Sequence, residues 1–578
     1  MSIKVAFIGA GSVGFTRRLM RDLLAVPELA ETHFAFTDIS KRNLDMVTRL
    51  CRKDIRSNDL PAEITATVDR RRALEGADYV VNCTRIGGLE AFRQDIEIPL
   101  KYGIDQCVGD TLCVGGILYG QRNIPCVLDF CRDIREVAAG DALFLNYANP
   151  NAMNTWAANA YGEVPTIGLC HGVQGGHRQI ANVIELLVNE HKSPDDPGYV
   201  RVTPQDVDII CAGINHQTWY VQVLYAGEDW TDRLLGGFEK HPTYSKTEKV
   251  RIDVLRRFGY YSTESNGHLS EYLPWYRKRP DEIPEWIAPD SWGHGETGGY
   301  LRVCTEGRNW FETDFPKWMA GESPPIGPGN RSHEHGSYII ESLETGRVYR
   351  GHFNVPNEGC ITNLPDDCIV EVPGYVDRNG VSIPQVGDLP LACAATLSAS
   401  VNVQRMSVEA AVAGDVTLLK QAVLHDPLTG AVCNPEEVWQ MVDEMLVAQA
   451  KWLPQYAAEV PAAKKRLAAA RRAKRYKGTW TWEGAARKKV RTVVELRSSG
   501  AKARGVLEAD KAAEQPSRGG TSAKKKRKKA KSRKRRTSKS GSARSGKGAA
   551  AKPGKRSGKA SGKKTWQATK TAKRRKRS

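Results

Sequence analysis

The fold is decided by Val5-Ala6-Phe7-Ile8-Gly9-Ala10-Gly11-Ser12-Val13-Gly14. A short apolar run typical of a buried strand leads into a glycine-rich turn, and residues 15–24 continue with apolar residues at helical spacing. Gly9 permits the tight turn, Gly11 lets the backbone approach a pyrophosphate, and Gly14 allows close packing of the helix on the strand. We therefore expect a dinucleotide-binding fold, with the cofactor phosphates at the start of the helix beside Ser12.

A second predicted strand ends in an acidic residue. Residues 34–37 are Phe-Ala-Phe-Thr, and Asp38 follows them, 24 residues after Gly14. A carboxylate at this position can accept a hydrogen bond from a ribose 2′-hydroxyl and would repel a 2′-phosphate. The pattern predicts that the cofactor is NAD rather than NADP.

The alternation of strands and helices continues to about residue 165, which predicts an α/β fold with a parallel sheet. Polar residues follow the later apolar runs, among them Asp110 in a glycine-rich loop and Asn149 before a proline. Ligands bind at the carboxyl ends of such strands, so we expect both side chains to bind substrate. An amide such as that of Asn149 can donate to and accept from hydroxyl groups, although an ordinary Asn-Pro turn explains it equally well.

Two later segments suggest a metal site. Cys170 lies in Gly168-Leu169-Cys170-His171-Gly172, and His216 lies in Cys211-Ala212-Gly213-Ile214-Asn215-His216. Each segment ends an apolar, strand-like run, and a thiolate and an imidazole are suitable ligands for a divalent transition ion. The alternative is a buried free cysteine and a hydrogen-bonded core histidine.

Charge divides the chain into two unequal parts. The net charge is +19, but residues 501–578 hold 30 Lys and Arg against 3 Asp and Glu, while residues 1–500 hold 55 against 63. We expect a basic linker at residues 461–520 and a disordered tail at residues 521–578, because the tail has too few apolar residues to form a core. Such a tail can bind nucleic acid non-specifically through phosphates, or it can be only a solvated extension.

Cysteine usage and hydropathy predict the compartment. The 13 cysteines contain no Cys-x-x-Cys pair, which favours a reducing cytoplasm over a disulfide framework. The chain begins without a signal-peptide pattern and has no run of about 18 apolar residues, so we expect no membrane span.

Together with Leu145-Asn146-Tyr147-Ala148-Asn149-Pro150, these motifs resemble those of glycoside hydrolase family 4, over residues 1–460. The resemblance is closest to the branch that acts on α-galactosides and α-galacturonides, although Gly172 stands where the α-galactosidases carry Ser. It implies a Rossmann-type domain at residues 1–165, like that of malate and lactate dehydrogenases. It also implies a mixed α+β domain for metal, substrate and oligomer contacts at residues 166–460.

The resemblance implies a mechanism and roles for individual residues. NAD⁺ oxidises the sugar at C3, a base removes the C2 proton, the aglycone leaves, water adds at C1, and the hydride returns. Cys170 and His216 would bind a divalent ion such as Mn²⁺, and His171 would protonate the leaving group. Glu264 and Tyr261 are the candidates for the base.

We therefore expect hydrolysis of α-glycosides, preferably α-galactosides, by a homodimer or homotetramer. The family leaves α-galacturonidase, α-glucuronidase and α-glucosidase activities open. Two other classes also remain: an NAD-dependent 2-hydroxyacid dehydrogenase, which would oxidise its substrate with net turnover of cofactor, and a DNA-associated protein acting through its basic tail.

Overall fold

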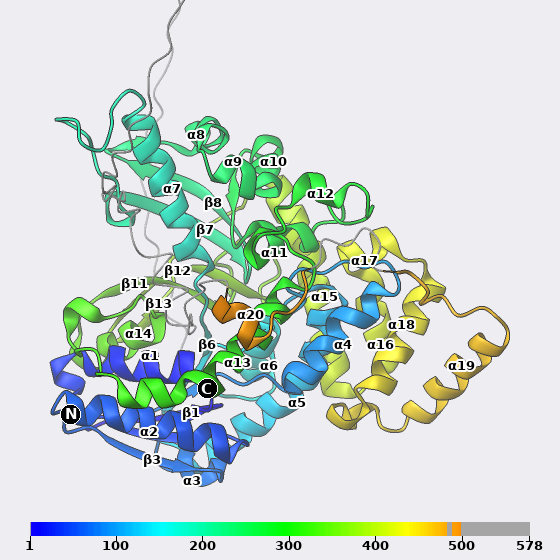
Figure 1. The fold of residues 1–578 in the computed structure, drawn as a ribbon, viewed down its shortest axis with the longest axis horizontal. Coiled ribbons are helices and arrows are strands. Elements are labelled where there is room, and N and C mark those ends of the chain that lie inside the picture. Colours follow the sequence, from blue (N-terminus) through cyan, green and yellow to red (C-terminus); the bar gives the residue numbers. More distant parts are fainter. Residues whose placement is uncertain (1, 482–487, 499–578) are drawn as a thin grey trace, which may run out of the picture. The chain divides into compact units, whose positions relative to one another are not determined.

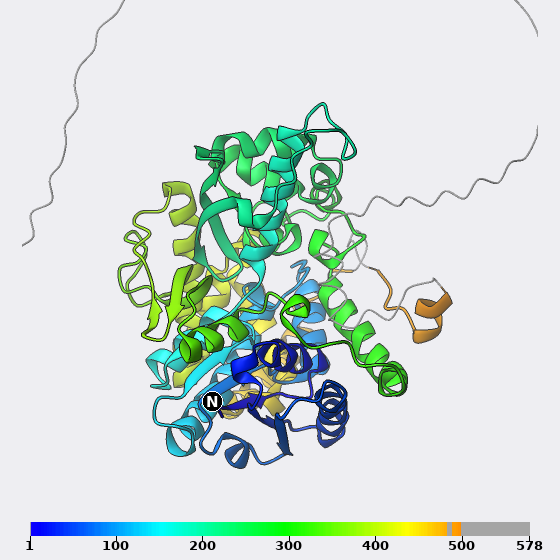
Figure 2. The same cartoon turned by 90° about the vertical axis from the view of Figure 1, so that its left-hand side faces the viewer.

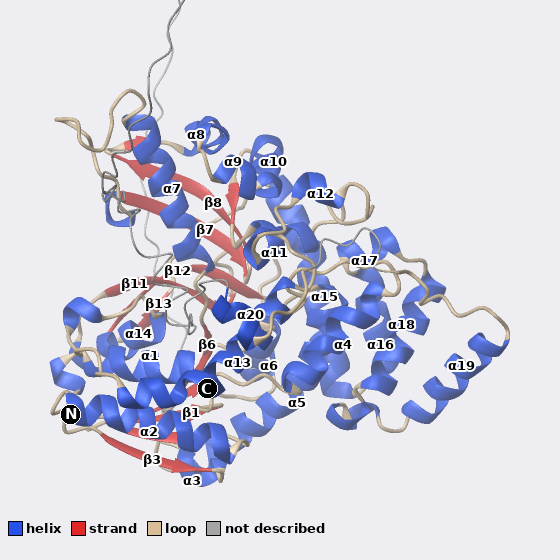
Figure 3. Cartoon of the chain, viewed as in Figure 1, coloured by secondary structure: helices blue, strands red, loops and turns tan. Residues whose placement is uncertain are grey.

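The computed structural model describes residues 2–481 and 488–498, and their strands form one 13-stranded sheet. The main order is β10-β8-β7-β12-β11-β6-β5-β4-β1-β2-β3, with β13 paired to β12 and β9 to β8. Figure 3 shows the strands in red, running from β3 near the bottom to β8 near the top. The strands are β1 (Lys4–Ile8), β2 (His33–Thr37), β3 (Glu63–Thr67), β4 (Tyr79–Asn82), β5 (Leu143–Asn146), β6 (Thr166–Gly168), β7 (Val207–Ile214), β8 (Gln217–Tyr225), β9 (Glu228–Asp229), β10 (Tyr261–Ser262), β11 (Tyr349–Pro356), β12 (Ile369–Asp377) and β13 (Gly380–Ser382).

The amino-terminal half of the sheet is parallel and has the order β3-β2-β1-β4-β5-β6. This is the order of a doubly wound dinucleotide-binding domain, so the predicted fold class is confirmed. Helices cover both faces. Val5 and Phe7 of β1 pack into one buried cluster, whereas Ala6 and Ile8 pack into another. Burial on both faces explains why β1 is continuously apolar.

The other half of the sheet is antiparallel. Strand β11 joins β6 through the pair Asn354–Gly168, and β12 joins β7 through the pair Glu371–Gly213. Strands β7 and β8 form a hairpin, to which β10 adds at the edge. Figure 1 and its rotated view in Figure 2 show β7 and β8 beside helices α7 to α10, apart from the blue dinucleotide-binding strands.

The carboxyl-terminal part of the described chain forms a group of packed helices. Helix α15 packs on α5, α6 and α16, and α18 packs on α4, α16 and α19. The α-helices are α1 (Val13–Leu24), α2 (Lys41–Ser57), α3 (Arg70–Leu74), α4 (Gly88–Leu100), α5 (Cys113–Val137), α6 (Asn151–Ala160), α7 (Gly172–Val188), α8 (Leu234–Lys240), α9 (Tyr244–Thr247), α10 (Lys249–Phe258), α11 (Asn266–Tyr272), α12 (Ile283–Trp286), α13 (Gly299–Ala320), α14 (His335–Thr345), α15 (Leu391–Ala413), α16 (Val416–His425), α17 (Pro427–Val432), α18 (Pro435–Ala448), α19 (Val460–Arg472) and α20 (Val493–Ser498).

The segment expected to be a linker, residues 461–520, begins with an ordered helix. In α19, Ala463 and Leu467 are four residues apart and both buried against the rest of the protein, and Arg466 forms an ion pair with Asp443 of α18. The alanine-rich, basic composition therefore supports a packed helix here as well as a solvated segment. The expected tail at residues 521–578 lies outside the described residues.

No helix of the described ranges combines the length and apolarity needed to cross a bilayer.

Candidate functional site

The predicted cofactor-binding residues lie together at the carboxyl ends of β1 and β2. Gly9 has φ +87°, a conformation that favours glycine. The backbone N–H of Gly11 donates to Oδ2 of Asp38 at 2.9 Å. A Cβ at Gly11 would lie 2.7 Å from the same oxygen. Because Gly11 has no Cβ, the space between Asp38 and Ser12, at the start of α1, stays open.

The next three parallel strands deliver polar side chains to the same edge of the sheet. Arg85 follows β4, Asn149 follows β5 and Cys170 follows β6. Asn149 Nδ2 donates to Asp110 Oδ2 at 3.0 Å, and Arg85 Nη2 lies 3.5 Å from that oxygen. Burial opposes ionisation of Asp110, but Arg85, His216 and His268 together outweigh it, and the pKa of Asp110 is lowered. The structure thus brings Asp110 and Asn149 together, as expected for substrate-binding residues, and adds Arg85.

Side chains that can ligate a metal ion lie around His216. This residue lies in the two-residue turn between β7 and β8 and has φ +64°. Cys170, His216 and Glu264 each offer a ligand atom, and these atoms lie within 4.8 Å of one another. Sulfur, nitrogen and oxygen donors at this separation fit a divalent transition ion. Burial raises the pKa of the Cys170 thiol well above its usual range, so an ion must displace a proton to bind there.

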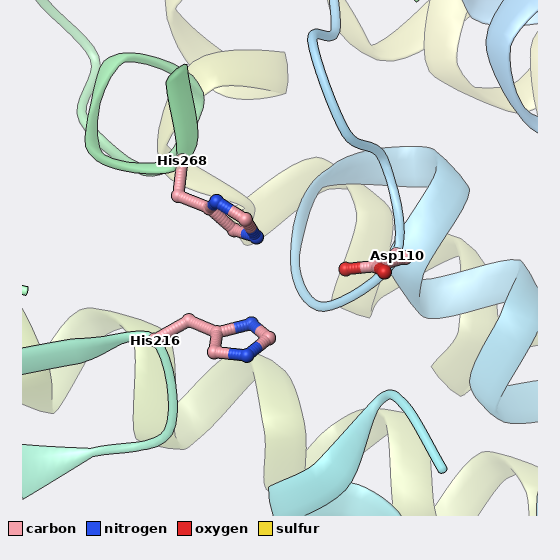
Figure 4. A group of neighbouring side chains, drawn as sticks. All are labelled: Asp110, His216 and His268. Atoms are coloured by element: carbon pink, nitrogen blue, oxygen red, sulfur yellow. The ribbon is translucent and has the colours of Figure 1, made fainter. Parts of the chain in front are cut away.

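His216 also belongs to a second group with Asp110 and His268, whose ligand atoms again lie within 4.8 Å of one another. Figure 4 shows these three side chains facing a common space from a turn, a loop and helix α11. Burial lowers the pKa of His268, which favours its neutral form. His268 was not among the predicted site residues. The sequence places His268 at the end of a polar stretch, residues 256–268, that could have indicated a functional site. Nothing in that stretch distinguishes His268 from its neighbours.

Glu264 faces both histidines. Its Oε2 lies 3.2 Å from Nε2 of His216 and 3.5 Å from Nε2 of His268. Burial opposes ionisation of Glu264, but His216 and then His268 outweigh it and lower its pKa. A Cβ at Gly172 would lie 2.9 Å from Cγ of Glu264. The glycine that departs from the pattern of the α-galactosidases therefore makes room for this carboxylate.

The other candidate base, Tyr261, lies elsewhere. Its side chain is fully buried in the cluster formed with Phe238 and Tyr220, and its hydroxyl donates to Gln179 Oε1 at 2.9 Å. Burial also raises its pKa well above the usual range. Glu264 is only three positions after Tyr261, yet of the two only Glu264 lies within ligand distance of Cys170 and His216. Of the two candidates for the base, Glu264 lies beside His216 and Tyr261 lies in the core.

His171 directly precedes α7, and its side chain is 40% exposed. Its Nε2 lies 2.7 Å from Oε2 of Glu334, a residue 163 positions away. The sequence carried no signal for Glu334, because only the packing of α14 against α1 brings it to His171. The position of His171 beside Cys170 and Glu264 is compatible with the predicted role as an acid.

Two further contacts hold the turn that carries His216. Thr111 Oγ1 lies 2.8 Å from Nδ1 of His216, and Asn215 Nδ2 donates to Glu371 Oε2 at 3.2 Å. Glu371 belongs to β12, and burial raises its pKa to about 7. Outer contacts of this kind orient a ligating histidine and select its tautomer.

Comparisons with known proteins agree with this geometry. The family model described as family 4 glycosyl hydrolase matches residues 4–186, and the model of that family's C-terminal domain matches residues 211–429. An α-galactosidase of Rhizobium meliloti (strain 1021) is 60% identical over 498 residues, which cover 86% of this chain and 97% of that protein.

Two solved structures are similar in fold. A putative glucosidase (lplD) from Bacillus subtilis has a TM-score of 0.66 at 25% identity, over 77% of this chain and 100% of that one. The 6-phospho-beta glucosidase of Thermotoga maritima, solved with manganese, NAD⁺ and glucose-6-phosphate, has a TM-score of 0.61 at 23% identity, over 78% of this chain and 99% of that one. The dinucleotide-type sheet and the possible metal ligands at the ends of its strands agree with these matches. The chain belongs to the family 4 glycosyl hydrolases.

Proposed function

We propose that this glycosyl hydrolase cleaves α-galactosides with the help of NAD⁺ and a divalent ion, Mn²⁺. The observation that carries the proposal is the group Cys170, His216 and Glu264, which lies at the same edge of the sheet as the Gly11–Asp38 turn. The 60% identical relative named as an α-galactosidase supports the substrate. Membership of a hydrolase family argues against the dehydrogenase alternative.

The residues present fit both NAD⁺ and a divalent ion. A side chain at Gly11 would fill the space in front of Asp38, and Asp38 is placed to accept from a ribose hydroxyl. Cys170 and His216 would hold the ion, since a thiolate and an imidazole can ligate divalent transition ions. When bound, NAD⁺ supplies a hydride acceptor and the ion a Lewis acid for the sugar oxygens.

The remaining residues bind the sugar and move protons. Asn149 and Asp110 would hydrogen-bond sugar hydroxyls, while Arg85 neutralises Asp110. Glu264, whose lowered pKa keeps it ionised near neutral pH, would accept the proton from C2. His171 would donate a proton to the leaving group.

The substrate is tested with 4-nitrophenyl α-galactoside, α-glucoside, α-glucuronide and α-galacturonide, each with and without NAD⁺ and Mn²⁺. We expect the α-galactoside to be hydrolysed fastest, only with both additions, and without net formation of NADH. A preference for a uronide would assign the other branch of the family. Stoichiometric NADH without release of 4-nitrophenol would contradict the proposal.

The base is tested by hydrolysis in D₂O. We expect deuterium at C2 of the released galactose, and slower exchange in Glu264→Gln. Tyr261→Phe is the matched control, because its hydroxyl contacts Gln179 rather than the metal-ligating group. Normal exchange in Glu264→Gln together with weakened Mn²⁺ binding would instead make Glu264 a ligand.

We propose three further properties. The 13 cysteines are all free thiols, which supports a cytoplasmic location. Membership of the family supports a homodimer or homotetramer. The charge of residues 501–578 supports non-specific binding of nucleic acid.

A further inference from the structure

We propose that Glu334 is the positioning residue of His171, fixing the orientation and the tautomer of its imidazole for protonation of the leaving group. The inference rests on the proposed hydrolysis and on His171 as the acid. It concerns a carboxylate that lies outside every motif of the sequence and that contacts His171 rather than the metal-ligating group.

Glu334 is almost completely buried and uses both carboxylate oxygens. Oε2 lies 2.7 Å from Nε2 of His171, and Oε1 accepts from Nη1 of Arg18 at 3.0 Å. Burial opposes ionisation of Glu334, but His171 and Arg18 outweigh it and lower its pKa to about 2. The carboxylate is therefore ionised throughout the neutral range and can only accept hydrogen bonds.

The segment that carries Glu334 is itself held by α1. Asp22, one turn after Arg18, accepts from the backbone N–H and the hydroxyl of Ser332. On the other side, Tyr147 stacks on the ring of His171 with centroids 6.3 Å apart, and its hydroxyl accepts from the N–H of Gly336. Glu334 is thus fixed between the helix that begins at the dinucleotide turn and the ring that it contacts.

This geometry has a chemical consequence. An ionised carboxylate 2.7 Å from Nε2 requires a proton on that nitrogen, so proton exchange with the substrate falls to Nδ1. A carboxylate commonly sets the tautomer of a catalytic histidine in this way. The Arg18 ion pair keeps the carboxylate charged and in place, because an unpaired buried charge would be strongly unfavourable.

The test compares two substrates in Glu334→Gln. With an alkyl α-galactoside, whose leaving group needs a proton, we expect kcat to fall about 10- to 100-fold with little change in KM. With 2,4-dinitrophenyl α-galactoside, whose leaving group departs as an anion, we expect a loss of less than about threefold. In a His171→Gln background, Glu334→Gln should change the alkyl-galactoside rate by less than about twofold, because the two residues act as one unit.

Glu341→Gln is the matched control. Glu341 lies on α14, the helix that Glu334 precedes, and pairs with Arg331 and Arg347 rather than with His171. It should leave both rates and their ratio unchanged. If Glu334→Gln does not fold, Arg18→Gln/Glu334→Gln removes both charges of the buried pair and should show the same dependence on the leaving group.

An equal loss on both substrates, or a loss that adds fully to that of His171→Gln, would show that Glu334 has only a structural role and would overturn the inference. Failure of the proposed function would look different, because the wild-type enzyme would then hydrolyse neither α-galactoside.

Discussion

Substituting Gly11 by alanine tests the cofactor site directly. The new Cβ would lie 2.7 Å from Oδ2 of Asp38 and 2.9 Å from Cβ of Asn43, where ordinary contacts begin at 3.4 Å. Asn43 belongs to α2 and cannot move freely, so the adjustment falls on the Asp38 carboxylate. That carboxylate must shift by about 0.7 Å, away from the N–H of Gly11 and from the place where a ribose would bind.

The size of the effect follows from the bond that is lost. A hydrogen bond to a charged group contributes about 1.5–3 kcal/mol, so misplacing Asp38 should raise the Kd for NAD⁺ by about 10- to 100-fold. The fold should survive at reduced stability, because Asp38 is a movable side chain but the contact with Cβ of Asn43 must be relieved by a shift of the backbone. We would measure NAD⁺ binding by calorimetry, with thermal unfolding as a check of stability.

Gly236→Ala is the matched control. Gly236 is an exposed helical residue at which a Cβ meets no atom within 4 Å, so NAD⁺ affinity should not change. An unaltered Kd in a folded Gly11→Ala enzyme would refute the reasoning, because it would mean that the Gly11–Asp38 turn does not hold the cofactor.

Three other outcomes are expected. Cys170→Ser should weaken Mn²⁺ binding at least about tenfold, because a hydroxyl is a poor substitute for a thiolate, and chelator should abolish hydrolysis by the wild-type enzyme; unchanged ion affinity would exclude Cys170 as a ligand. Tyr261→Phe should lower the free energy of unfolding by about 1 kcal/mol through loss of its bond to Gln179, without affecting exchange at C2; altered exchange with full stability would return Tyr261 to the chemistry. A chain ending at residue 500 should keep hydrolysis but lose salt-sensitive DNA binding, since residues 501–578 hold 30 Lys and Arg against 3 acidic residues; retarded migration of DNA by the truncated chain would assign that binding to the body.

The cofactor half of the protein was predictable because its signals are local. A strand, a glycine turn and an acid at the end of the next strand are set by neighbours in the chain, and Gly9, Gly11 and Asp38 meet as the pattern requires. The resemblance to the family also predicted Cys170 and His216 as a pair, and the structure brings them within ligand distance of one another.

The choice between Tyr261 and Glu264 depended on tertiary structure. Both lie in one polar stretch, but β10 pairs with β8 and directs Tyr261 into the core, while the chain turns before Glu264 and points it at His216. Sequence periodicity could not decide this, since a two-residue strand is defined by its partner rather than by its own pattern.

Which distant residues contact and support the site also depended on the tertiary structure. Glu334 lies 163 positions from His171 and reaches it through the packing of α14 on α1. Its charge is compatible with that burial because Arg18 and His171 surround it. A sequence by itself therefore determines groups set by local geometry, whereas partners from distant elements are determined by how the helices pack on the sheet.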